Sequence, residues 1–148
     1  MADDTPDTTR PAVLEPLRAL VGTWSLEGAH VQLPDPIRGR KTYEWLGQFL
    51  VEHSHYEHPD IPDSIAIIGA GEEAPLVEHY FDVRGVRRVY QMSFADGVWK
   101  FWRDAPGFSQ RTTGKFSDDG NRITVLAELS RDDATWHRDL ELTYTKVT

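Results

Sequence analysis

Hydrophobic and polar residues alternate along this chain in ten short segments that follow residue 22 and are separated by turn-forming residues. A period of two is typical of β-strands that bury one of their faces. The pattern predicts strands at residues 23–33, 38–46, 49–58, 64–70, 76–82, 86–94, 98–103, 109–116, 122–130 and 136–146.

The connections between these segments are short and rich in Pro, Gly, Asp and Asn. Such connections favour β-hairpins and leave no room for the long crossovers that join parallel strands. An antiparallel sheet with that many strands loses its exposed edges most simply by closing on itself. We therefore predict an all-β fold, a closed antiparallel up-and-down barrel of about ten strands.

The residues before the first strand have a different pattern. Apolar residues recur there at helical spacing, at Val13, Leu14, Leu17 and Leu20. Pro11 suits a first helical turn, whereas Pro16 falls inside the run. A short N-terminal helix that caps one end of the barrel is expected.

Residues 1–10 are polar, carry three aspartates and contain no apolar run. We predict a poorly ordered tail there, neither a signal peptide nor an anchor, and a single barrel domain over residues 11–148. No apolar segment is long enough to span a bilayer.

Charge and composition narrow the range of partners. The 148 residues include 24 acidic and 16 basic side chains, for a net charge of −8, and no cysteine. The negative field repels nucleic acid and anionic lipid surfaces, so neither nucleic acid nor a membrane is an expected partner. The absence of cysteine excludes disulfides and thiolate chemistry and is compatible with a cytoplasmic location.

Two arginines fall on faces that alternation assigns to the interior. Arg88 shares its face with Tyr90, Met92 and Phe94, and Arg138 shares its face with a set formed by Trp136, Leu140, Leu142 and Tyr144. A buried guanidinium needs a carboxylate, an aromatic ring or a ligand anion beside it. For Arg138, stacking on Trp24 or a role at the closed end is the simpler structural interpretation.

For Arg88 two interpretations stay open. One is a structural salt bridge to Glu44, Glu52 or Asp82, and the other is contact with a ligand anion, since Arg88 and Tyr90 form an Arg-x-Tyr pair on one strand face. Many large rings also line such an interior. The ligand-binding candidates are Arg88, Tyr90, Tyr43, Trp45, His79, Trp102, Gln110 and Arg138.

Trp99 and Trp102 lie on opposite faces of one predicted strand, so one of them points outward. An outward ring is covered either by a loop or by another subunit, which makes a homodimer a second expectation.

The histidines suggest alternatives to simple binding. His53 and His55 would project from one side of a strand, where two imidazoles can bind a metal if His30 or His79 supplies a third nitrogen. His79 shares a face with Val77 and Phe81, a pattern typical of a core histidine. A cavity histidine or carboxylate could also act as a general base in a small-barrel enzyme of isomerase or cyclase type, although no catalytic motif is present.

The opening run Leu20, Val21, Gly22, Thr23, Trp24 resembles the start of lipocalin-like bacterial barrels of unknown function, and more distantly that of nitrobindin-type heme barrels. The resemblance extends from Ala12 over nearly the whole chain. It implies a calycin-type barrel with an interior cavity whose closed end is plugged by the Trp24 indole. Fatty-acid-binding barrels hold a carboxylate with an Arg-Tyr pair like Arg88 and Tyr90.

In nitrobindins a histidine near the end of the last strand ligates heme. The matching position here falls near Asp139, and His137 lies two residues earlier. The resemblance thus leaves His137 as the alternative heme ligand. The function expected first is capture of a hydrophobic small molecule in the barrel cavity without a cofactor, and of an anionic one if Arg88 contacts the ligand.

Overall fold

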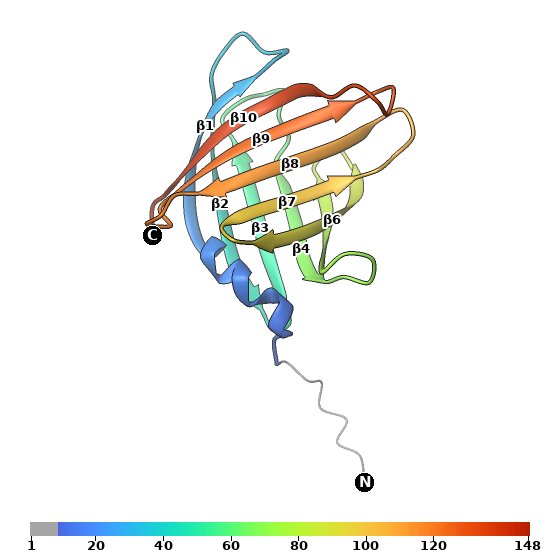
Figure 1. The fold of residues 1–148 in the computed structure, drawn as a ribbon. Coiled ribbons are helices and arrows are strands. Elements are labelled where there is room, and N and C mark those ends of the chain that lie inside the picture. Colours follow the sequence, from blue (N-terminus) through green and yellow to red (C-terminus); the bar gives the residue numbers. More distant parts are fainter. Residues whose placement is uncertain (1–8) are drawn as a thin grey trace.

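The computed structural model describes residues 9–148, which fold into a closed antiparallel β-barrel with one short helix at its N-terminal end (Figure 1). The elements are η1 Ala12–Leu20, β1 Gly22–His30, β2 Ile37–Leu46, β3 Phe49–Tyr56, β4 Ser64–Ala70, β5 Leu76–Asp82, β6 Arg87–Ala95, β7 Val98–Arg103, β8 Ser109–Phe116, β9 Arg122–Ser130 and β10 His137–Lys146.

Each strand pairs with its neighbours in sequence, and β1 pairs with β10 to close the cylinder. The predicted fold class is confirmed, because ten alternating segments joined by short turns leave no sheet edge once the ends meet. The strand ends differ from the expected ones by a few residues. β1, for example, stops at His30, where the Leu33 amide donates to the His30 carbonyl at the start of a turn.

The helix η1 is a 3₁₀-helix and covers one end of the barrel (Figure 1). Its fully buried residues are Leu14, Leu17 and Leu20. Side chains three residues apart lie above one another in a 3₁₀-helix, so these leucines form one apolar ridge against the lumen. Pro16 lies inside the helix on its exposed side.

Trp24 plugs this closed end. Its indole is fully buried, packs edge-on against Phe116 with ring centroids 6.3 Å apart, and donates from Nε1 to the Leu20 carbonyl at 2.7 Å. Gly22 precedes it with a φ of +126°, and a Cβ there would lie 2.2 Å from the Thr148 carbonyl oxygen. The Gly-x-Trp spacing thus ties the helix, the plug and the C-terminal end of the chain together.

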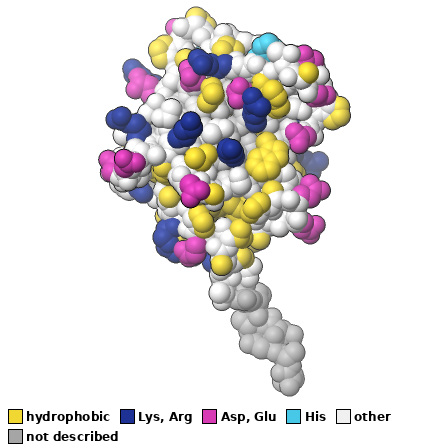
Figure 2. Space-filling view, viewed as in Figure 1, with side chains coloured by type: hydrophobic (Ala, Val, Ile, Leu, Met, Phe, Trp, Pro, Cys, Tyr) yellow, Lys and Arg dark blue, Asp and Glu magenta, His cyan; other side chains and the backbone are white. Residues whose placement is uncertain are grey.

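The lumen beneath η1 is apolar, whereas its middle and its other end, the mouth, carry polar groups. The fully buried residues near the closed end include Trp24, Leu50, Ile68, Leu76 and Met92. On the face shown in Figure 2, Lys and Arg alternate with Asp and Glu among hydrophobic side chains, so no large area carries one sign of charge.

β10 contains a register shift between Arg138 and Leu140, and this shift corrects one prediction. Leu142 and Tyr144 point inward as expected, but Arg138 lies on the outer face, where it pairs with Glu141 at 3.3 Å. An extra residue in a strand inverts the alternation of faces beyond it. Lys146, not Arg138, lies over the Trp24 ring.

The predicted tail falls almost wholly outside the described residues. Its last residue does not fit that prediction, because the Arg10 guanidinium stacks on Trp45 at 3.8 Å and donates to the Gly47 carbonyl. Within residues 9–148, no helix is long and apolar enough to cross a membrane.

Candidate functional site

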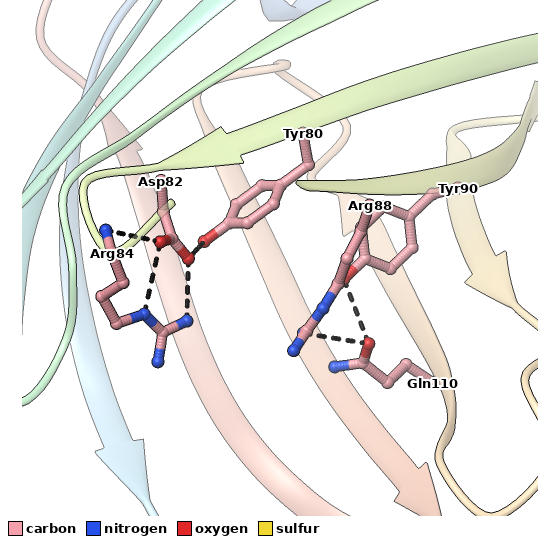
Figure 3. A network of polar contacts seen from close by, with 6 residues as sticks. All are labelled: Tyr80, Asp82, Arg84, Arg88, Tyr90 and Gln110. Atoms are coloured by element: carbon pink, nitrogen blue, oxygen red, sulfur yellow. Dashed lines mark hydrogen bonds and ion pairs between the residues drawn. The ribbon is translucent and has the colours of Figure 1, made fainter. Parts of the chain in front are cut away.

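The mouth of the barrel holds a polar cluster formed by Arg88, Tyr90 and Gln110, which we call the mouth cluster. Arg88 Nη1 and the Tyr90 hydroxyl both donate to the same Gln110 side-chain oxygen, at 3.3 and 3.1 Å (Figure 3). Arg88 and Tyr90 come from β6, whereas Gln110 comes from β8 on the far side of β7. The Arg88 guanidinium also lies 5.5 Å from the centre of the Phe108 ring.

A second guanidinium lies close by. Arg103 is half-buried and donates from Nη1 to the Phe108 carbonyl at 3.2 Å. Within residues 9–148, neither Arg88 nor Arg103 forms an ion pair, so two positive charges face the mouth with only neutral partners. A partly desolvated cation without a counter-ion favours an anion.

The wall of the barrel is open beside these arginines. Pairing between β6 and β7 ends at Gln91 and Trp102, and the remaining part of β6 separates from the segment that follows β7. A groove of about 710 Å³ occupies this gap, lined by His79, Tyr80, Phe81, Arg87, Arg88, Val89, Arg103, Asp104, Ala105 and Pro106. Of the mouth cluster, Arg88 lines this groove and is therefore reachable from the side of the barrel.

The neighbouring carboxylate, Asp82, is already neutralised. It accepts hydrogen bonds from Arg84 at 2.7 Å and from the Tyr80 hydroxyl at 2.9 Å (Figure 3). The hydrogen bond from Arg84 holds the pKa of Asp82 far below its usual range, while burial and the bond to Asp82 raise the pKa of Tyr80. Because Arg84 already balances the charge of Asp82, this carboxylate does not serve as the counter-ion of Arg88.

Deeper in the lumen lies a second polar group, the interior cluster, formed by Lys41, Glu52, Ser54, Glu78 and Tyr43. All five are buried. Lys41 Nζ and the Ser54 hydroxyl both donate to Glu52 Oε1 at 3.0 Å. Burial disfavours both charges, but each stabilises the other, so the pKa of Glu52 is lowered and that of Lys41 is raised.

Glu78 has a different environment from Glu52. It is 4% exposed, and the nearby Lys41 ammonium pairs with Glu52 and not with Glu78. Burial, together with the nearby negative charge of Glu52, raises its pKa to about 8. Glu78 is therefore a neutral carboxylic acid at pH 7 and can donate as well as accept a hydrogen bond.

This protonated state makes stability depend on pH. A carboxyl group whose pKa rises on folding stabilises the fold below its unfolded value, near 4.5, and loses that contribution as the pH approaches 8. Glu78→Gln, which mimics the neutral acid, should match the wild type near pH 5 and exceed it by a few kcal/mol near pH 9, since one pKa unit corresponds to about 1.4 kcal/mol. Urea unfolding at both pH values measures this, and an equal difference at both would contradict it.

Several sequence-predicted residues lie together inside the barrel. Arg88, Tyr90 and Gln110 form the mouth cluster, and Tyr43 belongs to the interior cluster. The salt bridge considered for Arg88 is absent from the described chain, since Glu52 pairs with Lys41 and Asp82 with Arg84. Trp45 lies at the closed end beneath Arg10, remote from the mouth.

Three other candidates lie on the outside of the barrel with their side chains away from the lumen. Besides Arg138, these are Trp102, opposite Gln91 and Arg111, and His79, which is exposed. The prediction of a core histidine was wrong because Leu76, Glu78 and Tyr80 form the inner face of β5, one residue out of step with the predicted face.

Trp99 is the inward ring of β7, and the homodimer suggested by Trp102 stays a prediction.

The histidine candidates do not form a metal site. His53 and His55 are exposed on the outer face of β3, and His55 pairs with Asp63 at 3.0 Å. Within residues 9–148, no group of three His, Cys, Asp or Glu side chains is placed to bind a metal. His30 pairs instead with Asp139 at 3.0 Å.

His137 opens β10 and is exposed on the rim, where it lines none of the described grooves. The lumen near the mouth is occupied by rings in contact, with Tyr90 and Phe101 centroids 5.7 Å apart and those of Trp99 and Phe101 5.1 Å apart. An enclosed planar group would need both a buried axial donor and free space. This arrangement does not fit a heme held by His137.

Another groove of about 710 Å³ lies on the outer surface of β1, β2 and β3, and includes Arg38, Arg40, His53 and Asp63. The three strands are fully paired beneath it, so it does not lead into the lumen. The mouth groove, beside an open seam and unpaired cations, is the stronger site candidate.

Sequence reasoning missed Arg103 as a site residue and did not recognise the interior cluster. In β2, alternation places Lys41 on the same face as Tyr43. This pattern could have identified Lys41 as a residue of the interior cluster. Glu78 was hidden because β5 has apolar residues on both faces.

Comparison with known proteins supports the fold alone. No protein-family model matches the sequence, and the comparison with curated proteins gave no match. The structure is similar to the crystal structure of Rv2717c from M. tuberculosis, with a TM-score of 0.64 and 12% sequence identity over 94% of this chain and 99% of that chain. At this identity the similarity establishes a shared barrel architecture.

Proposed function

We propose that this lipocalin-like barrel binds a small hydrophobic molecule that carries an anionic group, and that Arg88 and Arg103 hold the anion at the mouth. The observation that carries the proposal is the pair of half-buried guanidiniums that have only neutral hydrogen-bond partners in the described chain. A carboxylate or a similar anion would supply the missing counter-charge in a partly dry site.

The surroundings of the groove support an apolar body for this ligand. Three large hydrophobic residues are exposed on or near the β5–β6 hairpin: Phe81 at 38%, Val83 at 77% and Val89 at 46%. Phe81 and Val89 line the groove itself. Exposed apolar side chains that flank a groove are typical of ligand-binding sites.

The resemblance of Arg88 and Tyr90 to the carboxylate-binding pair of fatty-acid-binding barrels agrees with this proposal. The lumen itself is largely filled by rings, so the ligand is placed in the mouth groove and the seam between β6 and β7, with no need for a large central cavity.

Binding of a dansyl-labelled fatty acid, followed by fluorescence and by its displacement with decanoate, tests the proposal. Arg88→Met keeps the length of the aliphatic stem and removes the charge. We expect it to weaken decanoate binding about 10- to 100-fold, because a hydrogen bond to a charged group contributes about 1.5–3 kcal/mol.

The matched control is Arg138→Met, which removes an exposed arginine from the outer face of β10. It should bind decanoate like the wild type. Equal affinities of the wild type and Arg88→Met, or a wild type that binds neither molecule, would refute the proposal.

A further inference from the structure

The strand β6 has a free backbone edge where the wall of the barrel opens. The β6–β7 hairpin turns at Asp96 and Gly97, which both have positive φ. Ala95 and Val98 flank this two-residue turn and lie opposite each other. The residues that flank such a turn exchange both backbone hydrogen bonds, and hydrogen-bonded residues then alternate along the strand. Val89 therefore directs its N–H and C=O toward the β7 side of β6.

The β5–β6 hairpin gives the same assignment from the other end of the strand. The Asp82 N–H donates to the Val86 carbonyl at 3.0 Å, so the backbone of Val86 faces β5. Alternation then directs the backbone groups of Arg88 and Tyr90 toward β5 as well. Val89 lies between these two residues and faces the opposite way.

No strand covers Val89 on the β7 side. Pairing of β6 with β7 ends two residues away, at Gln91. The segment after β7 turns away from β6, and this turn is held by the Ser109 hydroxyl, which accepts from the Ala105 N–H at 3.2 Å and donates to the Ala105 carbonyl at 3.1 Å. Within residues 9–148, no backbone hydrogen bond joins Val89 to the segment after β7.

The mouth groove runs along this free edge. Unpaired N–H and C=O groups at the edge of a strand bind extended molecules through main-chain hydrogen bonds. Val89 and Phe81 supply apolar surface to the groove. Its charged residues are three arginines and one aspartate, Arg87, Arg88, Arg103 and Asp104. The groove therefore suits an occupant that combines an apolar part, an anion and a hydrogen-bond donor for the Val89 carbonyl.

We propose that the ligand of this groove is an N-acyl amino acid, which pairs with Val89 as a short added strand. Its amide N–H donates to the Val89 carbonyl, and its carboxylate accepts from the Val89 N–H and from the guanidiniums of Arg88 and Arg103. The acyl chain is the apolar part. A plain fatty acid has no donor for the Val89 carbonyl, so this ligand class is narrower than the proposed function, on which the inference rests.

The experiment compares N-decanoylglycine with its ester isostere, decanoyloxyacetic acid, by displacement of the dansyl-labelled fatty acid. The two compounds differ only in the amide N–H, which an ester oxygen replaces. We expect the wild type to bind N-decanoylglycine about three- to tenfold more tightly, which is the range of one neutral hydrogen bond. Acetyl-leucyl-leucyl-glycine carries the same amide and carboxylate on a peptide. Tighter binding of this peptide than of N-decanoylglycine would assign the edge to a peptide end and overturn the acyl class.

Val89→Pro is the matching protein variant. The proline ring removes the N–H that faces the gap and fills the space beside it, whereas the ladder to β5 uses Arg88 and Tyr90 and keeps its hydrogen bonds. The variant should bind the amide and the ester equally. Circular dichroism checks its fold.

Hydrogen exchange in the wild type keeps the test independent of this variant. With N-decanoylglycine bound, the Val89 amide should exchange at least tenfold more slowly. The amides of Arg88 and Tyr90, which already face β5, should change much less.

The outcomes separate the two proposals. If Arg88→Met weakens decanoate binding but the wild type binds the amide and the ester equally, or the Val89 amide keeps its exchange rate, the anion site stands and the added strand is wrong. If decanoate binds the wild type and Arg88→Met equally, the proposed function fails, and the ligand class inferred from it fails too.

Discussion

Replacement of Lys41 by methionine is expected to lower the free energy of unfolding by about 3–5 kcal/mol, because it leaves the Glu52 carboxylate buried without its partner. Lys41 and Glu52 are 9% and 4% exposed, and Nζ lies 3.0 Å from Oε1. Ser54 alone cannot stabilise this charge in the lumen. Urea unfolding at pH 7 measures the loss.

The double variant Lys41→Met, Glu52→Leu provides the control. It removes both charges and should recover most of the lost stability, since an apolar pair of similar volume is often as stable as a buried ion pair. A single variant that loses less than about 1 kcal/mol would mean that water reaches Glu52, which would contradict a closed lumen at this level.

Trp24→Ala is expected to destabilise the barrel by about 3–5 kcal/mol, because it opens a cavity in the plug at the closed end. The indole is fully buried, contacts Phe116 and donates to Leu20 on η1, so its loss also releases the helix from the barrel. Thermal and urea unfolding measure the change.

Trp136→Ala is the matched comparison for Trp24→Ala. Trp136 stacks on Arg111 at 4.1 Å on the outer surface, where such a contact contributes about 0.5–1 kcal/mol. Similar losses for the two tryptophan variants would show that Trp24 is not the plug of the closed end.

The fold was predictable from the sequence because its signals are local. A period of two with turn residues between segments defines each strand, and Gly22 with Trp24 marks the closed end. Closure followed from the number of strands and from the cost of free edges. The three-residue spacing of Leu14, Leu17 and Leu20 also matches the period of a 3₁₀-helix.

Assignment of faces failed where it depended on register. In β5 both faces carry apolar residues, so pattern alone could not choose between His79 and Glu78 as the inward residue. In β10 the bulge at Asp139 has no signature in the sequence and moves Arg138 to the outside. Both cases show that one residue of displacement decides which side chain reaches a site.

The candidate site was predictable in part. Arg88, Tyr90 and Gln110 share one polar cluster because their strands alternate regularly up to the mouth. The contribution of Arg103 and the gap between β6 and β7 depend on where strand pairing ends, which only the three-dimensional arrangement reveals.

The most direct test of the central claim is NMR spectroscopy of the arginine side-chain Nε–H groups during titration with decanoate, with signals assigned by substitution. If the mouth binds the acid, the signals of Arg88 and Arg103 shift together and saturate, while those of Arg38 and Arg40 on the outer groove stay in place. Saturating shifts at Arg38 and Arg40, with Arg88 and Arg103 unmoved, would contradict an anion site at the mouth of the barrel.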